Sequence, residues 1–341
     1  MALFLGQCVS TDRRVAWRRT DPKGNAQKIY FLIIEKLKKL KKVKWDGKGK
    51  GSALGNLIFV KLIQLFGPFA AYILLIFVAF YYTLFDRASI KAIRKFRKKL
   101  GLRPDNIFAI HRHFYSFGVS LIDKISFSIM KKPPFKFTYI NAEYIFKALK
   151  EGKGAILLSA HIGNWEVAGN LLDDYFRTPI NVIMLDNERE SIKKVYKTSE
   201  EKRRFKIIPV TQDGLDMMIP VKSALANNEI VCFHGDRVLG ETGILLPFLQ
   251  GIAPFPSGPF YIGALTGAPL IPVTTIKDSL THYTFQAYSP ITFKDLTRKN
   301  RESRINEGMQ SYITILENII KKHPYQWFNF FDIWISNGEN Q

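Results

Sequence analysis

The sequence predicts an α/β protein in which helices cover both faces of a mixed, largely parallel sheet, preceded by an N-terminal membrane helix. After residue 132, short apolar runs alternate with longer amphipathic segments, which is typical of strand–helix units. The apolar runs are continuous, as in strands covered on both faces. We expect strands at 137–140, 155–160, 181–185, 206–210, 230–233, 270–275 and 283–288, and helices at 142–149, 164–176, 188–204, 215–226, 258–266 and 304–322.

The positive charge is concentrated in the first third of the chain. Of the 341 residues, with a formal net charge of +21, residues 1–105 hold 23 Lys and Arg against 6 Asp and Glu. The rest of the chain holds 27 against 23. A basic segment of this density favours an anionic partner, either nucleic acid or an anionic lipid surface. We expect a basic, poorly ordered region at 1–50, a hydrophobic membrane anchor at 51–86 and a catalytic domain at 87–341.

An uncharged run over residues 62–85 favours the membrane as that partner. About 20 apolar residues cross the hydrocarbon core as a helix. Because Gly67 and Pro68 interrupt the run, a helix over 69–85 is short for a full span. Basic clusters flank the run on both sides, which leaves open a span and a re-entrant or in-plane hairpin. A buried core helix of a soluble protein is the alternative.

Two further segments carry structural expectations. Residues 87–132 have helical spacing of apolar side chains, with a break at 103–105 where Asp105 is expected to cap the next helix. The apolar segment 243–259 is too hydrophobic for an ordinary exposed loop. We expect it to line an acyl groove or to dip into the membrane, with a buried loop in the core as the alternative.

His161 directly follows the predicted strand 155–160, and ligands of such sheets bind beyond the carboxyl ends of the strands. Asn164 is suited to cap the following helix, and Glu166 lies in its first turn. The intervening turn brings the Glu166 carboxylate back to the imidazole, where it fixes the tautomer and stabilises the imidazolium. His161 is therefore the candidate general base and Glu166 its partner. The alternative is a histidine that only ends a strand.

A second polar cluster, His234-Gly235-Asp236-Arg237, follows the predicted strand 230–233. Arg237 is suited to bind a phosphate, and Asp236 to orient Arg237 or a substrate hydroxyl. A surface turn with a local ion pair is the alternative. His234 and Asp236 are too few ligands for a metal, so we expect no metal site.

The sequence lacks the motifs of several competing chemistries. It has no Gly-x-Ser-x-Gly elbow, no phosphate-binding loop, no dinucleotide fingerprint and no His-Glu-x-x-His. With no evident nucleophile, the economical mechanism is direct transfer to an acceptor hydroxyl that His161 deprotonates.

The segment His161-Ile162-Gly163-Asn164-Trp165-Glu166 resembles the His-x-Gly-Asn-Trp-Glu signature of the lipid A late acyltransferase family of lauroyl and myristoyl transferases. That family belongs to the glycerophospholipid acyltransferase superfamily. Further features resemble the family in its order, over about residues 52–335: Asp236-Arg237, Pro247-Phe248, Ser257-Gly258-Pro259, the segment 267–273 and the segment 323–328.

The resemblance implies an enzyme of lipid A and lipopolysaccharide biosynthesis, at the inner membrane with its catalytic domain facing the cytoplasm. It implies no bound cofactor, a membrane (glyco)lipid acceptor and an acyl-carrier-protein or coenzyme A thioester as donor. It also implies His161 as base with Glu166 as its partner, and Asn164, Asp236, Arg237 and Gly258 around the substrates. An acidic carrier protein suits the basic N-terminal third.

Two departures bear on the acceptor. The Trp-x-His-Arg-Arg ending of the lipid A enzymes is absent, and His234-Gly235-Asp236-Arg237 replaces the usual Asp-Gln-Asp type. Another glycolipid or an aminolipid is therefore open as acceptor.

Three other functions stay open. A catalytically silent, membrane-anchored binding or scaffold protein would keep the same fold. An acyl-thioester or lipid hydrolase would use the same His–Glu pair with water as acceptor. Nucleic-acid binding rests on charge alone and lacks a motif of basic and aromatic residues, so no nucleic-acid partner is expected.

Overall fold

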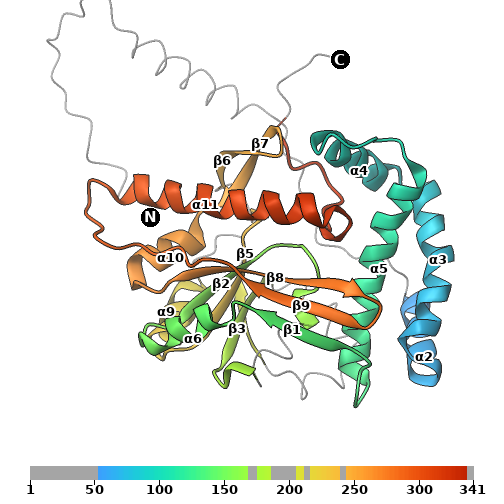
Figure 1. Cartoon of the computed structure of the whole chain (residues 1–341), viewed down its shortest axis with the longest axis horizontal. Coiled ribbons are helices and arrows are strands. Elements are labelled where there is room, and N and C mark those ends of the chain that lie inside the picture. The colour runs from blue at the N-terminus through green and yellow to red at the C-terminus, as the bar shows by residue number, and fades with distance from the viewer. Residues whose placement is uncertain (1–52, 168–174, 186–204, 211–215, 239–242, 336–341) are drawn as a thin grey trace, which may run out of the picture. The chain divides into compact units, whose positions relative to one another are not determined.

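The computed structural model describes residues 53–167, 175–185, 205–210, 216–238 and 243–335, which form the elements labelled in Figure 1. Its main sheet has seven strands in the order β1-β9-β8-β2-β5-β3-β4. Every neighbouring pair is parallel except β8 and β9. The predicted mixed, largely parallel sheet is therefore confirmed. The strands are β1 (Lys136–Ile140), β2 (Ala155–Ser159), β3 (Ile180–Leu185), β4 (Lys206–Val210), β5 (Ile230–His234), β8 (Leu270–Ser279) and β9 (His282–Ala287).

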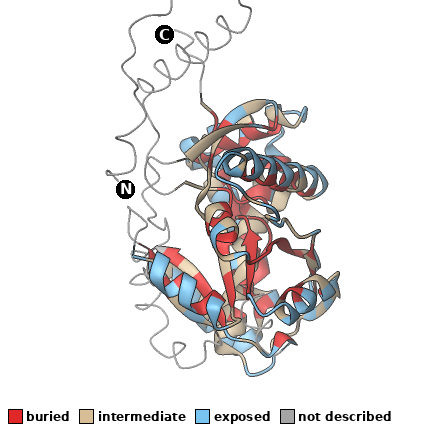
Figure 2. Cartoon of the chain, turned by 90° about the vertical axis from the view of Figure 1, so that its left-hand side faces the viewer, coloured by how far each residue is buried: buried red, intermediate tan, exposed pale blue. Residues whose placement is uncertain are grey.

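Helices cover both faces of this sheet, as predicted. On one face, apolar side chains of the strands share a core with α9 (Met218–Ala226), α10 (Gly258–Thr266) and α11 (Arg301–Lys322). On the other face they share a core with α6 (Glu143–Lys150). Figure 2 shows the buried strands lying between helices whose outward sides are exposed. Since both faces are covered, each central strand is apolar along its length.

The apolar segment predicted as a loop is an antiparallel hairpin of β6 (Gly243–Phe248) and β7 (Gly251–Pro256). Phe248 and Phe255 are buried in the same core as α11. The indole Nε1 of Trp334 donates to the Phe248 carbonyl at 3.0 Å. Most residues of both strands are buried or half-buried, which explains how so apolar a segment is accommodated. Its buried side chains belong to the core, which agrees with the alternative of a segment buried in the core.

The N-terminal part of the described chain is helical, with α2 (Ala53–Phe66), α3 (Pro68–Phe85), α4 (Arg87–Lys99) and α5 (Ile107–Ile129). The expected break between α4 and α5 is confirmed, but its capping residue is not the one predicted. Asn106 accepts a hydrogen bond from the Ala109 amide at 3.1 Å, whereas Asp105 pairs with Arg94 at 2.8 Å. Asn and Asp cap about equally well, so sequence pattern alone does not choose between neighbours.

Among the described residues, α3 is the helix that is long and apolar enough to cross a membrane, and 33% of it is buried. It starts one residue earlier than predicted because Pro68 fits the first turn of a helix. The expectations for residues 1–50, for the helix at 188–204 and for most of the helix at 164–176 lie outside the described residues.

Candidate functional site

The loop that carries His161 is fixed against β8 by a glycine. Gly163 has a φ of 66°, and a Cβ at this position would lie 2.0 Å from the carbonyl oxygen of Thr275. The next amide, that of Asn164, donates to the same Thr275 oxygen at 2.8 Å. Only glycine tolerates both the left-handed conformation and this close approach. The turn after β2 therefore has one backbone path, and it fixes where His161 emerges.

Asn164 caps the following helix, as predicted, and also joins the loop to α5. Its Oδ1 accepts from the Val167 amide at 3.4 Å, while its Nδ2 donates to the Ser120 carbonyl at 2.9 Å. The side chain is buried. Its amide thus serves the internal structure, and its predicted contact with substrate stays a prediction.

The side chain that holds the His161 ring at Nδ1 is Asp236. Nδ1 lies 2.8 Å from Asp236 Oδ1, and Oδ2 accepts from the His161 backbone amide at 3.0 Å. The indole Nε1 of Trp327 donates to Oδ2 at 3.2 Å. Burial alone would raise the pKa of Asp236, but the His161 imidazole and the Arg237 guanidinium outweigh it and hold that pKa below its usual range. An ionised Asp236 requires the proton on Nδ1, which leaves Nε2 as the basic nitrogen.

Glu166 forms an ion pair with Lys124 of α5. Both side chains are about four-fifths buried, so the pair is shielded from bulk water. The bond to His161 Nδ1 is made by Asp236 and not by Glu166. The predicted role of Glu166 as partner of His161 stays a prediction. The role expected of Asp236 from the sequence was to orient Arg237 or a substrate hydroxyl. Its place beside His161 depends on the parallel register of β2 and β5, which aligns Ser159 with His234 and which sequence pattern does not reveal.

A closing segment, residues 324–329, lies along the His161 loop. The Gly163 amide donates to the Gln326 carbonyl at 2.8 Å, and the Phe328 amide donates to the His161 carbonyl at 2.7 Å. The Gln326 side chain bonds both the amide and the carbonyl of Lys277 in β8, at 3.0 and 2.9 Å. From the sequence, residues 323–328 were expected only as a feature that resembles the family. The closing segment is a structural part of the site because it bonds the backbone of the His161 loop and, through Trp327, the Asp236 carboxylate.

His234 stacks on the His161 ring, with centroids 4.5 Å apart and planes 27° from parallel. The edge of Trp165 meets His234 at 4.8 Å between centroids. Burial, with the nearby His161, lowers the pKa of His234 to about 3, so this imidazole is neutral near pH 7. His161, His234 and Asp236 offer ligand atoms within 4.8 Å of one another. The Asp236 oxygens already accept from three protein donors, an arrangement that fits a His–Asp pair better than a metal site.

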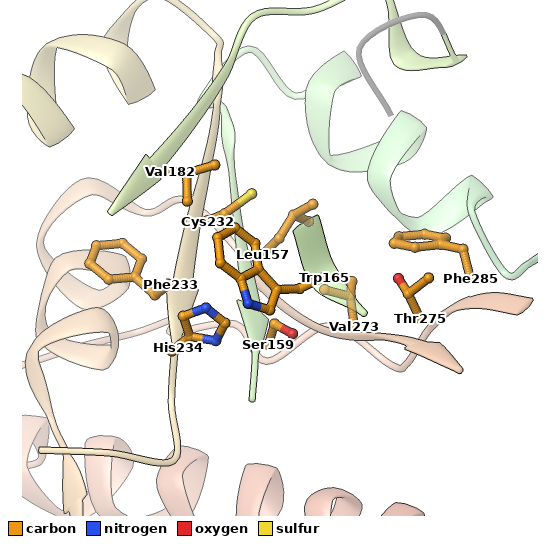
Figure 3. A pocket seen from close by; sticks show the side chains of 10 residues that line it. All are labelled: Leu157, Ser159, Trp165, Val182, Cys232, Phe233, His234, Val273, Thr275 and Phe285. Atoms are coloured by element: carbon orange, nitrogen blue, oxygen red, sulfur yellow. The ribbon is translucent and has the colours of Figure 1, made fainter. Parts of the chain in front are cut away.

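An apolar pocket lies beside His234, and Figure 3 shows the side chains that line it. Trp165 and His234 line part of it, the His234 ring stacks on that of His161, and the other walls come mainly from the strands. The remaining lining residues are Leu157, Ser159, Val182, Cys232, Phe233, Val273, Thr275 and Phe285. Burial raises the pKa of the Cys232 thiol to about 12, so this cysteine is an apolar wall group and not a thiolate nucleophile.

Comparison with known proteins identifies the family. Residues 55–336 match the sequence model of a family described as bacterial lipid A biosynthesis acyltransferases. This match covers most of the chain. The chain belongs to that family. The resemblance noted from the His161–Glu166 segment is therefore confirmed at the level of the family.

Two similar relatives of this family member are named phosphatidylinositol mannoside acyltransferases. The protein of Mycolicibacterium smegmatis is 28% identical over 134 residues, which is 39% of this chain and 44% of the relative. The protein of Mycobacterium tuberculosis is 28% identical over 130 residues, which is 38% of this chain and 41% of the relative. The chain thus matches less than half the length of either relative.

Arg237 and Gly258 were predicted to bind substrate, and their described surroundings do not test that role. Arg237 donates from Nη2 to the Phe328 carbonyl at 2.7 Å and lies over the Phe331 ring at 5.2 Å. It therefore helps hold the closing segment, and its predicted phosphate contact stays a prediction. Gly258 is the first residue of α10, and a Cβ there would meet no atom within 4 Å, so packing does not demand glycine.

Proposed function

We propose that this family member transfers a fatty acyl group from a thioester of acyl carrier protein or coenzyme A to a hydroxyl of a membrane (glyco)lipid. The observation that carries the proposal is the His161–Asp236 pair at the edge of an apolar pocket. A base of fixed tautomer beside an apolar pocket suits a reaction between an acyl chain and a hydroxyl. We place the reaction at the cytoplasmic side of the inner membrane, where both thioester donors are made.

In the proposed reaction His161 acts first as base and then as acid. Nε2 takes the proton of the acceptor hydroxyl as its oxygen attacks the thioester carbonyl carbon. The new C–O bond forms, the C–S bond breaks, and the departing sulfur receives the proton from the imidazolium. Asp236 stays ionised throughout and stabilises the imidazolium, as the carboxylate does in hydrolytic triads. No covalent acyl-enzyme is required.

The apolar pocket is the proposed place of the acyl chain. Its walls at Leu157, Val182 and Phe285 are carbon-lined and buried, so they exclude water from the chain. A thioester carbonyl held beside His234 would lie near His161, because the His234 ring lines the pocket and stacks on the His161 ring with centroids 4.5 Å apart.

A sugar-bearing lipid is the acceptor class that we favour. The family is described by lipid A biosynthesis, and the named relatives by phosphatidylinositol mannoside. Both descriptions name glycosylated lipids that carry phosphate. A lipid A precursor is one member of this class, and the departures around Asp236 and in the closing segment leave other glycolipids as candidates.

The test is an assay with radiolabelled acyl carrier protein and, separately, labelled acyl coenzyme A, each incubated with extracted membrane lipids. We expect label to appear in a lipid with the unaltered enzyme and not with His161→Ala. Label appearing only as free fatty acid would instead support the hydrolase. No movement of label from either donor would contradict both enzymatic functions and favour the silent binding protein.

A further inference from the structure

Helix α3 has one buried and one exposed face. Its exposed face carries large apolar side chains at helical spacing, an arrangement that water does not favour. These are Phe69, Ile73, Ile76, Phe77, Phe80 and Leu84. The opposite face, with Ala71, Leu75 and Ala79, is buried.

The buried face packs on α5 over most of its length. Gly118 of α5 lies so close to Leu75 that a Cβ there would be 2.3 Å from Leu75 Cδ1. Nearer the end of α3, the rings of Tyr82 and Phe114 stack with centroids 6.0 Å apart. In Figure 1, α5 stands between α3 and the sheet. The two helices are therefore one packed unit, not a free anchor beside a domain.

The other face of α5 is fastened to the catalytic domain. Ser120 accepts from Asn164 at 2.9 Å, and Lys124 pairs with Glu166, so α5 holds two residues of the His161 segment. At the middle of α5, the rings of Phe117 and Phe328 lie 5.3 Å apart between centroids.

A buried polar cluster joins α3, α5 and the sheet directly. The Asp123 carboxylate of α5 is fully buried and accepts from the hydroxyls of Tyr72 of α3 and Tyr283 of β9. It also forms an ion pair with Lys277 of β8 at 2.5 Å. Removing α3 would take away the Tyr72 hydroxyl and open this ion pair to lipid or water. Breaking a buried charge pair is costly, so α3 stays with α5.

These contacts conflict with a helix that crosses the bilayer. The 18 residues of α3 would span about 27 Å, nearly the whole hydrocarbon core. Because α5 runs beside α3 and packs on the sheet, a spanning α3 would bring the Lys124–Glu166 and Lys277–Asp123 ion pairs and the end of the sheet to membrane depth. Charged groups are costly at that depth, and an open sheet edge facing lipid does not occur there.

A basic stripe follows α3 directly in the chain. On α4 the exposed side chains Arg87, Lys91 and Lys98 recur at helical spacing, while Ile90 and Ile93 are buried. The exposed apolar face of α3 complements the acyl region of an anionic membrane, and the basic stripe of α4 complements its phosphates.

We propose that α3 lies in the plane of an anionic membrane surface, with its exposed face in the acyl region and the α4 stripe at the phosphates. The chain then docks on one leaflet through α3 and does not cross the bilayer there. The proposal concerns lipid binding alone, and it holds or fails whether or not the enzyme transfers acyl groups.

The test measures depth at three points along the exposed face. Single cysteines replace Phe69, Phe77 or Leu84 in the full chain with Cys8→Ser, and each carries a fluorophore. Vesicles of phosphatidylglycerol and phosphatidylcholine contain lipids brominated at known depths. We expect similar, shallow depths at all three sites, and no quenching at Lys222→Cys on α9, on the far side of the sheet in Figure 1. A central site much deeper than the two ends, or no quenching at any site, would overturn the proposal.

A second measurement tests whether the basic stripe of α4 contributes to membrane binding. Flotation with phosphatidylglycerol vesicles compares the unaltered chain with R87Q/K91Q/K98Q, which we expect to bind at least 10-fold more weakly. The matched control K294Q/R298Q/K299Q removes three exposed charges before α11 and should bind as the unaltered chain does. Circular dichroism verifies that both variants are folded. Equal weakening in both triples, or none in the first, would contradict docking through α4.

Discussion

At the scale of single residues, the site depends on the hydrogen bonds of the Asp236 carboxylate. Asp236 places one oxygen on His161 Nδ1 and the other on the His161 amide and the Trp327 indole. Three donors fix its orientation, and through it the ring and its tautomer. His161 remains 23% exposed at its side chain, so the base can reach a substrate.

Neutralising Asp236 should therefore lower the rate of acyl transfer more than neutralising Glu166. Asp236→Asn presents an amide to Nδ1 and favours the wrong tautomer, so we expect kcat to fall by about 10³- to 10⁴-fold with little change in KM. Glu166→Gln loses the ion pair with Lys124 and should cost less. Steady-state kinetics with a thioester donor measure both. A larger loss for Glu166→Gln would show that Glu166, not Asp236, is the partner that matters.

A second prediction at this scale concerns the substitution Gly163→Ala. Gly163→Ala puts a methyl group 2.0 Å from the Thr275 oxygen in a left-handed backbone region. The loop must move, and a displacement of about 1 Å at a catalytic group costs about 100-fold in rate. We expect kcat to fall by that factor or more. Gly258→Ala is the matched control, because a Cβ there meets no atom within 4 Å, and it should fold and express as the unaltered chain does. Equal activity of Gly163→Ala and the unaltered enzyme would contradict the loop geometry.

At the scale of elements, side chains from five strands, β2, β3, β5, β8 and β9, line the proposed acyl pocket. Val182 of β3, Val273 of β8 and Phe285 of β9 contribute side chains from one sheet face. Val182 lies on β3, two places from β2 in the sheet, so a substitution there changes the pocket without touching His161, which follows β2.

Val182→Phe should shorten the acyl chain that the enzyme prefers. The added ring fills space that two or more methylene groups would occupy, whereas Cys232→Ala enlarges the same wall. We expect the ratio of kcat/KM for long over short donors to fall at least 10-fold for Val182→Phe and to rise or stay equal for Cys232→Ala. Competition between two labelled donors measures the ratio directly. An unchanged ratio in Val182→Phe would place the acyl chain elsewhere.

At the scale of the whole molecule, the sequence predicted the strand–helix alternation because continuous apolar runs are a strong signal for strands buried on both faces. It also placed His161 and Asp236 at strand ends. It did not pair them, since His161 and Asp236 are 75 residues apart and only the sheet order makes β2 and β5 neighbours. The role of residues 324–329 was hidden for the same reason. Hairpin β6–β7 was missed because Gly and Pro residues obscure its alternation.

Two buried histidines predict how stability depends on pH. Burial lowers the pKa of His113 to about 3 and that of His234 to about 3. In the unfolded chain each takes a proton near pH 6.5, so the folded state loses stability as the pH falls below that value. Each contributes a slope of up to about 1.4 kcal/mol per pH unit.

His113→Phe separates this effect from other groups, because a phenyl ring fits among Phe96 and Tyr325 without titrating. Urea unfolding at pH 7, 6 and 5 should show a smaller pH dependence in the variant than in the unaltered chain. The same slope in both would mean that His113 is protonated in the folded state.

The central claim is that the His161 imidazole activates an acceptor hydroxyl. The most direct measurement is the single-turnover transfer of labelled acyl group from a bound thioester to lipid, by the unaltered enzyme and by His161→Gln, with donor binding measured separately. The account predicts unchanged donor binding and a transfer rate lowered by at least about 10³-fold in the variant. Transfer by His161→Gln within 10-fold of the unaltered rate would contradict it.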